Sequence, residues 1–557
     1  MARSETAAVD PRSGYCAATR AFRSKRADVP LPDDPDLDVV TFLATRRHSG
    51  VVALVDAATG RRTTFAELWR AVAGAATALA APPFSLRKGH VALILSPNSV
   101  HFPVAALAAM SLGAVVTTAN PLNTAAEIAK QVADACPVLA FTTRDLLPKL
   151  PLAAHANLKI ILLEPAHNHH LPTTTDPRII ATIDEISATT PNPSRRRDRV
   201  TQDDQATLLY SSGTTGPSKG VVATHRSLIA MVQIVMTRFR LDDSAGATET
   251  FLCTVPMFHV YGLVAFATGL LGCGATVVVL SKFELPEMLR CITAYGVTYL
   301  PLVPPILVAM VAHPKPLPLG QLRKVLSGGA PLSKELIEGF RDKYPRVEIL
   351  QGYGLTESTA IGASTDSAEE SRRYGTAGLL SPNTEAKIVD PDSGEALPVN
   401  RTGELWIRGP YVMKGYFKNT EATQSTVTPD GWLKTGDLCY IDEDGYLFVV
   451  DRLKELIKYK GYQVPPAELE ALLLTHPDVT DVAVIPFPDR EVGQFPMAYV
   501  VRKKGSNLSA AEVMEFVAKQ VAPYKKVRKV AFVTDIPKNA SGKILRKDLI
   551  KLATSKL

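Results

Sequence analysis

Short apolar runs rich in β-branched residues alternate with longer stretches of helical periodicity along the first two thirds of the chain. The runs predict strands at 51–55, 91–95, 114–117, 159–163, 206–210, 275–280, 322–326 and 347–350. Between them, Thr64 is a candidate N-cap of a helix and residues 103–113 form an Ala-rich helical stretch. This alternation is typical of βαβ units, so we expect a largely parallel sheet.

The pattern changes after residue 385 to shorter strands and turns, which predicts a small antiparallel or barrel-like subdomain. A basic connector at 452–461 separates it from a compact α+β unit with helices predicted at 466–474 and 510–520. We therefore expect an α/β fold with a large N-terminal domain at 1–451, built of stacked α/β subdomains plus the barrel-like one, and a small C-terminal domain at 452–557. The polar, proline-rich segment 1–35 is expected to drape over the body.

Composition places the chain among ordinary soluble globular proteins. Its 557 residues are too many for one core, and 46% are hydrophobic and 21% charged. The net charge of +7 is a weak bias without a dense basic patch, which argues against nucleic acid. Glycines at 269, 272 and 274 break the uncharged run 262–280 into a helix, a turn and a strand, so we expect buried core there and no membrane span.

Cysteine and histidine spacing argues against a zinc site. The six cysteines lack C-x-x-C spacing, and this absence is typical of proteins in a reducing compartment. The His167–His170 group lies in a polar loop without a second cluster of metal-ligating residues. The last three residues, Ser555, Lys556 and Leu557, match the peroxisomal address that a soluble import receptor reads. We therefore expect the peroxisome as the location and that receptor as a partner.

A run of hydroxyl residues, glycines and one lysine, S-S-G-T-T-G-P-S-K-G at 211–220, follows the strand predicted at 206–210. Glycine lets backbone N–H groups approach an anion, the hydroxyls add donors, and Lys219 supplies a point charge. The common nucleotide loop needs a hydroxyl residue after its lysine, where this chain has Gly220. The run therefore suits anionic oxygen, with a flexible surface loop as the alternative.

Two further glycine-rich segments follow predicted strands: S-G-G-A-P at 327–331 and Q-G-Y-G-L-T-E at 351–357. In open α/β sheets, ligands bind outside the carboxyl ends of the strands. We therefore expect the three loops to converge on one pocket.

These loops resemble those of the adenylate-forming superfamily and, within it, the plant 4-coumarate:CoA ligases and the peroxisomal clade of 4-coumarate:CoA ligase-like acyl-CoA synthetases. Further matching motifs are Phe258–His259, G-E-L-W-I-R-G at 403–409, T-G-D at 435–437, D-R-L-K-E-L-I-K-Y-K-G at 451–461 and P-K-N-A-S-G-K at 537–543. The resemblance covers nearly the whole chain. It implies that ATP and a carboxylic acid form an acyl-adenylate and pyrophosphate, and that the thiol of coenzyme A then displaces AMP.

The resemblance also implies roles for the matched residues. Those expected to hold the β- and γ-phosphates are Ser211, Ser212, Gly213, Thr214, Thr215 and Lys219. Glu357 is expected to ligate Mg²⁺, and Thr356 to donate to the α-phosphate. Asp437 is expected to accept hydrogen bonds from the ribose hydroxyls beside Arg452. The residues expected to line the adenine and acyl-adenylate pocket are Ala330, Gln351, Gly352 and Tyr353.

Lys543 is implied as the residue of the adenylation step, because a mobile ammonium can neutralise the charge that develops between the carboxylate and the α-phosphate. The resemblance brings Lys454, Lys458 and Gln463 to the intermediate, and Lys282, Lys460 and Gly461 to coenzyme A. For Lys282, a solvated lysine is the alternative. Since Lys543 and the segment 458–463 cannot both face the pocket, we expect a mobile C-terminal domain that rotates about a hinge near 452–454.

The acyl pocket is expected to be lined by His259, also a candidate catalytic residue, and by Tyr261, Ala265, Val303, Gly328, Ala330 and Ala360. The chain departs from the 4-coumarate ligases at Trp406, where they usually carry cysteine, and at 358–364. Together with the peroxisomal tail, these departures favour fatty acids or cyclopentenone precursors of jasmonate as the substrate over 4-coumarate itself. Hydroxycinnamate-like acids stay among the candidate substrates. The alternatives are a luciferase-like oxygenase of the same fold and an inactive nucleotide- or acyl-binding scaffold.

Overall fold

The computed structural model describes residues 9–164, 176–192, 198–211, 218–239, 249–330, 332, 334–459, 462–489, 492–521, 523–539 and 542–554. One sheet has the strand order β22-β11-β10-β6-β5-β7-β8-β9. Its strands are β5 (Val91–Leu95), β6 (Val115–Ala119), β7 (Leu139–Thr142), β8 (Lys159–Leu162), β9 (Ile179–Thr182), β10 (Gln205–Ser211), β11 (Lys219–Thr224) and β22 (Gly415–Tyr416). Strands β10, β6, β5, β7, β8 and β9 are parallel, as the alternating pattern predicts, and β11 turns back antiparallel to β10.

A second sheet begins as a parallel array with the order β3-β13-β12-β14-β15-β16 and antiparallel β4 at its edge. These strands are β3 (Val52–Asp56), β4 (Arg62–Thr64), β12 (Thr250–Cys253), β13 (Thr276–Val279), β14 (Tyr299–Leu302), β15 (Lys324–Gly328) and β16 (Glu348–Tyr353). Ser327 lies opposite Gln351, and Gly328 opposite Gly352. The two glycine-rich segments therefore leave this sheet side by side.

The same sheet continues through β17 into an antiparallel half with the order β17-β18-β24-β23-β21-β19-β2-β1, and β20 pairs with β19. These strands are β1 (Tyr15–Cys16), β2 (Ala21–Arg23), β17 (Ala363–Ser364), β18 (Thr376–Leu380), β19 (Glu385–Val389), β20 (Ala396–Leu397), β21 (Gly403–Arg408), β23 (Leu433–Ile441) and β24 (Tyr446–Arg452). The subdomain predicted after residue 385 is thus joined to the parallel half. The expectation that 1–35 only drapes over the body is wrong for β2, which pairs with β19.

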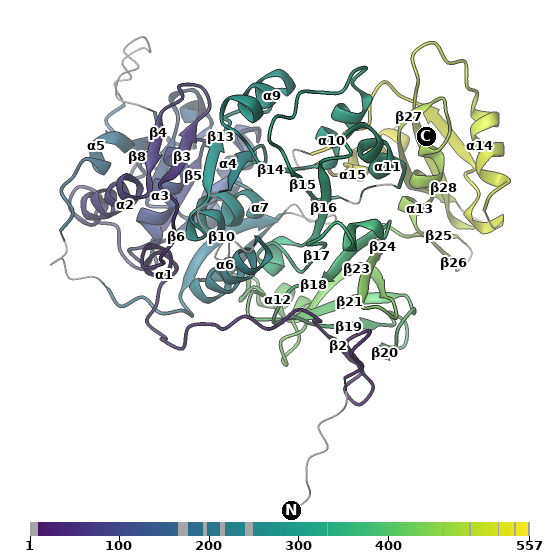
Figure 1. Ribbon diagram of the computed structural model, residues 1–557, viewed down its shortest axis with the longest axis horizontal. Coiled ribbons are helices and arrows are strands. Elements are labelled where there is room, and N and C mark those ends of the chain that lie inside the picture. The colour runs from purple at the N-terminus through teal and green to yellow at the C-terminus, as the bar shows by residue number, and fades with distance from the viewer. Residues whose placement is uncertain are drawn as a thin grey trace, which may run out of the picture.

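The third sheet belongs to the C-terminal part and has the order β26-β25-β28-β27, with β29 parallel to β28. Its strands are β25 (Ile457–Tyr459), β26 (Tyr462–Val464), β27 (Val479–Asp489), β28 (Gly493–Arg502) and β29 (Lys529–Phe532). The basic connector is therefore partly strand, because β25 pairs with both β26 and β28. Figure 1 shows this sheet at one end of the molecule.

The helices pack mainly around these sheets. They are α1 (Val39–Ala44), α2 (Phe65–Ala80), α3 (His101–Met110), α4 (Ala125–Ala135), α5 (Ile183–Ser187), α6 (His225–Phe239), α7 (Val260–Gly262), α8 (Leu270–Gly272), α9 (Leu285–Ala294), α10 (Pro304–Ala312), α11 (Lys334–Lys343), α12 (Thr420–Thr426), α13 (Pro466–Leu474), α14 (Ala510–Ala518) and α15 (Arg546–Thr554). The predicted N-cap Thr64 is confirmed: it forms a capping box with Glu67.

The uncharged run 262–280 contributes to the core. It folds as part of α7, a π-helix at Leu263–Gly269, then α8 and β13, and most of its side chains are buried. Within the described ranges, no helix is long and apolar enough to cross a membrane.

The apolar core of the C-terminal sheet is separate from the rest. Its clusters contain buried residues from Ile457 to Ala553, whereas the clusters of the other two sheets contain buried residues from Phe22 to Leu447. Each part thus buries its own apolar side chains.

Candidate active site

The motif at 211–220 spans a β-hairpin. Ser211 ends β10, Lys219 begins β11, and the two residues lie opposite each other. Ser212, Gly213, Thr214 and Thr215, between them, lie outside the described residues. The Lys219 ammonium is 4.9 Å from the ring centroid of Tyr416, so the lysine of the motif rests against an aromatic face.

Tyr416 joins Lys219 to the predicted metal ligand. Its hydroxyl donates a hydrogen bond of 3.0 Å to Glu357 Oε1, and its strand β22 pairs with β11, which carries Lys219. The Lys219 cation and the Glu357 carboxylate thus both contact the Tyr416 side chain. Thr356 precedes Glu357 in a 3₁₀ turn at Thr356–Ser358. The sequence motifs missed Tyr416, because nothing local to β22 indicates which strand it pairs with.

The chemistry of this corner fits Mg²⁺ bound together with a phosphate ligand. Magnesium is usually held by one or two carboxylates plus phosphate oxygens, and Glu357 supplies one carboxylate beside the hairpin motif. In the part of the chain that the structure describes, no group of three or more His, Cys, Asp or Glu side chains could hold a metal ion. Metal binding at Glu357 therefore depends on oxygens that a ligand brings.

Asp437 is the buried centre of a second cluster. It lies opposite Arg452 in the pairing of β23 with β24, and its Oδ1 is 3.2 Å from Arg452 Nε. The Tyr353 hydroxyl donates to Oδ2 at 2.6 Å. Burial raises the pKa of Asp437, and the Arg452 cation opposes that effect. The carboxylate is thus oriented from both sides by residues of two neighbouring motifs.

Lys543 reaches this cluster from the C-terminal part. Burial, followed by the nearby Arg452 cation, lowers the pKa of Lys543 to about 8, while Glu455 and Asp437 oppose the shift. Its backbone N–H donates to Asn539 Oδ1 at 2.9 Å. The preceding Gly542 lies against α10, because a Cβ there would be 2.9 Å from the Pro305 ring. The loop of Lys543 is therefore docked on the N-terminal part.

The ends of β15 and β16 carry two buried polar atoms that a ligand could satisfy. Ser327 Oγ and Gln351 Nε2 have no hydrogen-bond partner among the described residues, although their side chains are buried. The two residues lie opposite each other, and Ala330 and Gly352 follow in the same segments. Because buried polar groups are normally hydrogen-bonded, this strand edge is prepared for a polar ligand. Sequence motifs assigned Gln351 and missed Ser327.

Two residues predicted to line the acyl pocket, His259 and Gly328, lie against Tyr261. A Cβ at Gly328 would be 3.2 Å from the Tyr261 ring, so the glycine makes room for that side chain. His259 Nδ1 accepts the Tyr261 backbone N–H at 3.2 Å, and burial lowers the pKa of His259. Ala265 and Val303 are partly buried against the same core. His259 thus caps α7 beside the predicted pocket, where burial disfavours its charged form.

A strained turn borders the same region. Thr359 has φ +50° and Ala360 has φ +106°, values that residues with a Cβ rarely adopt. Their turn brings the Ala360 carbonyl so close to Gly354 that a Cβ on Gly354 would overlap it. Gly354 of the Y-G-L-T-E motif is thus required by packing, and such strain is often found at ligand sites.

The structure does not bring every predicted site residue to the cluster around Asp437, Arg452 and Lys543. Lys454 and Lys458 are exposed, and Lys458 lies opposite Gln463 in the pairing of β25 with β26. The Lys282 side chain is 80% exposed, and its ammonium is 3.0 Å from the Glu284 carboxylate. Five further residues with predicted roles lie outside the described residues: Lys460, Gly461, Ser555, Lys556 and Leu557. The His167–His170 group also lies outside them.

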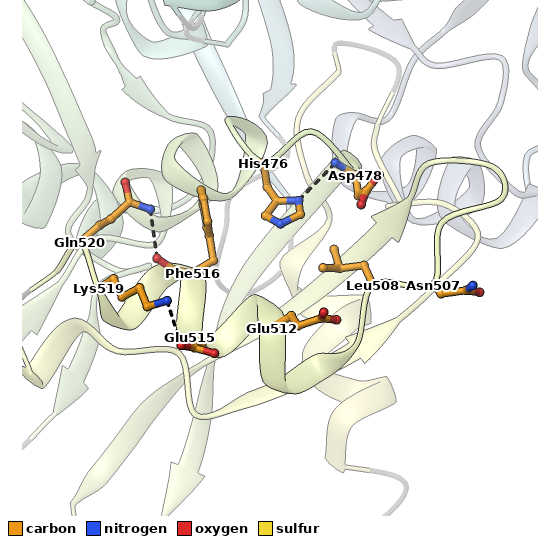
Figure 2. A pocket seen from close by; sticks show the side chains of 9 residues that line it. All are labelled: His476, Asp478, Asn507, Leu508, Glu512, Glu515, Phe516, Lys519 and Gln520. Atoms are coloured by element: carbon orange, nitrogen blue, oxygen red, sulfur yellow. Dashed lines mark hydrogen bonds and ion pairs between the residues drawn. The ribbon is translucent and has the colours of Figure 1, made fainter.

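A hollow of about 660 Å³ lies elsewhere, on the C-terminal part. Figure 2 shows it lined by residues of α14 and by the turn of His476 and Asp478. His476 packs edge-on against Phe516, and Lys519 pairs with Glu515. None of the predicted site residues lines this hollow, so the size of a surface depression does not identify the site here.

Two family models match the chain: AMP-binding enzyme at residues 42–417 and AMP-binding enzyme C-terminal domain at residues 468–543. The chain is 88% identical to 4-coumarate–CoA ligase-like 4 of Oryza sativa subsp. japonica over 100% of both chains. It is 62% identical to peroxisomal OPC-8:0-CoA ligase 1 of Arabidopsis thaliana over 99% of both.

Solved structures show the same fold. ATP-bound MatB from Rhodopseudomonas palustris has a TM-score of 0.82 and 27% identity, covering 93% of this chain and 99% of that one. O-succinylbenzoate coenzyme A synthetase (MenE) from Bacillus subtilis, in complex with ATP and magnesium ion, has a TM-score of 0.77 and 28% identity, covering 92% and 99%.

Proposed function

Because the chain belongs to the AMP-binding enzyme family and is an ATP-dependent acid–CoA ligase, we propose that the cluster around Asp437, Arg452 and Lys543 is its adenylate-forming site. The observation that carries this proposal is the place of the Lys543 loop. It lies against α10 of the N-terminal part, near enough to Arg452 and Asp437 for their charges to affect the pKa of Lys543. The alternatives of an oxygenase and an inactive scaffold lose weight, since the close relatives are CoA ligases.

In the first half-reaction, an oxygen of the substrate carboxylate attacks the α-phosphorus of ATP, and the bond to pyrophosphate breaks. Asp437 accepts hydrogen bonds from the ribose hydroxyls, since a carboxylate can accept two. The Lys543 ammonium lies between the carboxylate and the α-phosphate and stabilises the negative charge of the transition state. Ala330, Gln351, Gly352 and Tyr353 line the adenine and acyl-adenylate pocket, where the Gln351 amide and the neighbouring Ser327 hydroxyl meet polar ligand atoms.

The phosphate end of ATP lies at the hairpin of β10 and β11. Lys219 and the motif residues from Ser211 to Thr215 hold the β- and γ-phosphates, and Thr356 donates to the α-phosphate. Glu357, oriented by the Tyr416 hydroxyl, is the ligand for Mg²⁺. Bound there, Mg²⁺ would neutralise phosphate charge and make pyrophosphate a better leaving group.

The second half-reaction needs another arrangement of the C-terminal domain. The thiolate of coenzyme A attacks the acyl carbon and AMP leaves. Lys454, Lys458 and Gln463 contact the intermediate, and Lys460, Gly461 and Lys282 contact coenzyme A; the ion pair of Lys282 with Glu284 gives that assignment the least support. The separate core of the C-terminal sheet supports rotation as a unit about a hinge near 452–454.

The acid is proposed to be OPC-8:0 or a related jasmonate precursor, ahead of fatty acids and hydroxycinnamate-like acids. The 62% identity to a peroxisomal OPC-8:0-CoA ligase supports this choice, and so do the small residues Gly328, Ala330 and Ala360 that are expected to line the acyl pocket. The same relative and the terminal Ser-Lys-Leu support import into the peroxisome. A fluorescent fusion that keeps this terminus should enter peroxisomes, and one without the last three residues should stay outside.

Substrate-dependent ATP–pyrophosphate exchange tests the proposal. The purified chain is supplied with OPC-8:0, saturated fatty acids of graded length and 4-coumarate, and thioester formation is measured in parallel. We expect exchange and thioester with OPC-8:0 at the highest kcat/KM. Preference for 4-coumarate would contradict the substrate assignment, and a lack of exchange with every acid would contradict the active site. Light or O₂ consumption without thioester would support the oxygenase instead.

A further inference from the structure

The residues Thr435, Gly436 and Asp437 bulge out of β23. In the pairing of β21 with β23, Glu404 lies opposite Leu438 and Trp406 lies opposite Lys434. The single residue Leu405 between them therefore faces all three residues of the T-G-D motif. Bulges of this kind re-aim a side chain, and here the bulge presents Asp437 to Tyr353 and Arg452.

The backbone of this bulge is held by Glu404. The Gly436 N–H donates to Glu404 Oε1 at 3.0 Å, and the Thr435 hydroxyl donates to the Leu405 carbonyl at 2.7 Å. Gly436 has φ +71°, a left-handed conformation that favours glycine. Its carbonyl accepts the Leu453 N–H at 2.9 Å. The bulge is thus tied to β21 on one side and to the connector on the other.

Trp406 in turn fixes Glu404. The indole Nε1–H donates to Glu404 Oε2 at 2.7 Å, and the Lys434 ammonium is 4.9 Å from the indole ring. Each oxygen of the Glu404 carboxylate therefore has its own N–H donor. A cysteine at position 406 could not supply the indole donor. The departure of this chain from the 4-coumarate ligases thus affects the bulge that carries Asp437.

We propose that Glu404 and Trp406 are positioning residues that set the place of the Asp437 carboxylate for the nucleotide ribose. Glu404 holds the bulge through the Gly436 amide, and Trp406 holds Glu404 in the rotamer that reaches it. This inference rests on the proposed role of Asp437 as the acceptor of the ribose hydroxyls. It predicts that both residues act on nucleotide recognition without touching the nucleotide.

The test compares binding of ATP and of 2′,3′-dideoxy-ATP to the full chain by isothermal titration calorimetry. Trp406→Phe keeps an aromatic ring beside Lys434 and removes the donor to Glu404. We expect its affinity for ATP to fall about three- to tenfold, the effect of one ordinary hydrogen bond, because the lost donor acts on the nucleotide only through Glu404. The affinity for the dideoxy nucleotide should stay within about twofold of wild type. Equal weakening of both nucleotides would show a merely structural role, and unchanged binding of both would also overturn the proposal.

Three further variants make the result specific. Glu404→Gln presents an amide N–H to the indole N–H and should reproduce Trp406→Phe, so a failure of one variant to fold leaves the other as the test. Trp432→Phe is the matched control in the same subdomain, because Trp432 Nε1 has no hydrogen-bond partner among the described residues, and it should leave the ratio of affinities unchanged. Asp437→Asn tests the ribose role itself: if it leaves the ratio at the wild-type value, that role is wrong and the positioning inference falls with it.

Discussion

At the scale of single residues, Lys543 meets two opposing requirements. In the proposed adenylation step it must be buried near Asp437 to act on a bound nucleotide, and it must stay charged to neutralise the transition state. Burial, however, disfavours the charge. Lys543→Ala should lower the rate of acyl-adenylate formation by about 10²–10³-fold, as expected for the loss of one preorganised electrostatic group. Thioester formation from supplied acyl-adenylate should stay near wild type. Equal loss of both half-reactions in rapid-quench assays would contradict the division of labour.

The lowered pKa of Lys543 predicts a pH dependence. With a pKa of about 8, the ammonium loses its proton as the pH rises through that value. The rate of adenylation should therefore be highest below pH 8 and decline above it. Lys543→Arg should move the decline to higher pH, because arginine stays protonated. The measurement is the pH profile of kcat/KM for ATP in ATP–pyrophosphate exchange, because this parameter reports the pKa values of the ligand-free enzyme. An identical alkaline limb in both proteins would assign that limb to another group.

Tyr416 joins Lys219, the proposed phosphate ligand, to Glu357, the proposed metal ligand. Tyr416→Phe keeps the ring under Lys219 and removes the hydrogen bond to Glu357. The Mg²⁺ concentration for half-maximal exchange should rise about 10- to 100-fold, the effect of one hydrogen bond to a charged group. Tyr411→Phe, which removes a hydroxyl paired with Thr384, is the control and should leave this concentration unchanged. A rise in both variants would indicate general loosening of the segment.

At the scale of elements, the turn after β16 depends on a glycine. Gly354→Ala would force its Cβ onto the Ala360 carbonyl, so the turn must shift. We expect a loss of about 2–3 kcal/mol in the free energy of unfolding, as for other overpacked sites, measured by urea denaturation. Gly362→Ala is the matched control in the same segment, since its Cβ would make only ordinary contacts from 3.7 Å. It should change stability by less than about 1 kcal/mol.

At the scale of the whole molecule, Arg546 links the Lys543 loop to the connector. Its guanidinium lies 2.5 Å from Glu455 and 2.7 Å from Glu470, and all three side chains are largely buried. Arg546→Met would leave two buried carboxylates without their cation, at a cost of about 3–5 kcal/mol. Hydrogen exchange of the β27 amides should report this loss. Lys519→Met removes the exposed pair with Glu515 shown in Figure 2 and should cost less than about 1 kcal/mol.

Local patterns in the sequence predicted most of the elements. Buried strands such as β5 and β13 were confirmed within a residue or two, and α13 was confirmed at both ends. The pattern missed β1 and β2, because two or three residues pair with β19 only through contacts far along the chain. It also predicts only 482–485 of β27 and 498–501 of β28, because the outer residues of these strands are supported by each other across the hairpin.

The sequence by itself determined the family and the residues proposed to carry the chemistry, because the proposed roles of motif residues such as Lys219, Glu357 and Asp437 depend on side-chain types that the reaction demands. Only the tertiary structure decided how they are held. Tyr416 meets Glu357 and Lys219, Trp406 reaches Glu404 beside the T-G-D bulge, and Lys543 docks near Asp437. These contacts depend on strand register and on the packing of two parts of the chain, which no local pattern encodes.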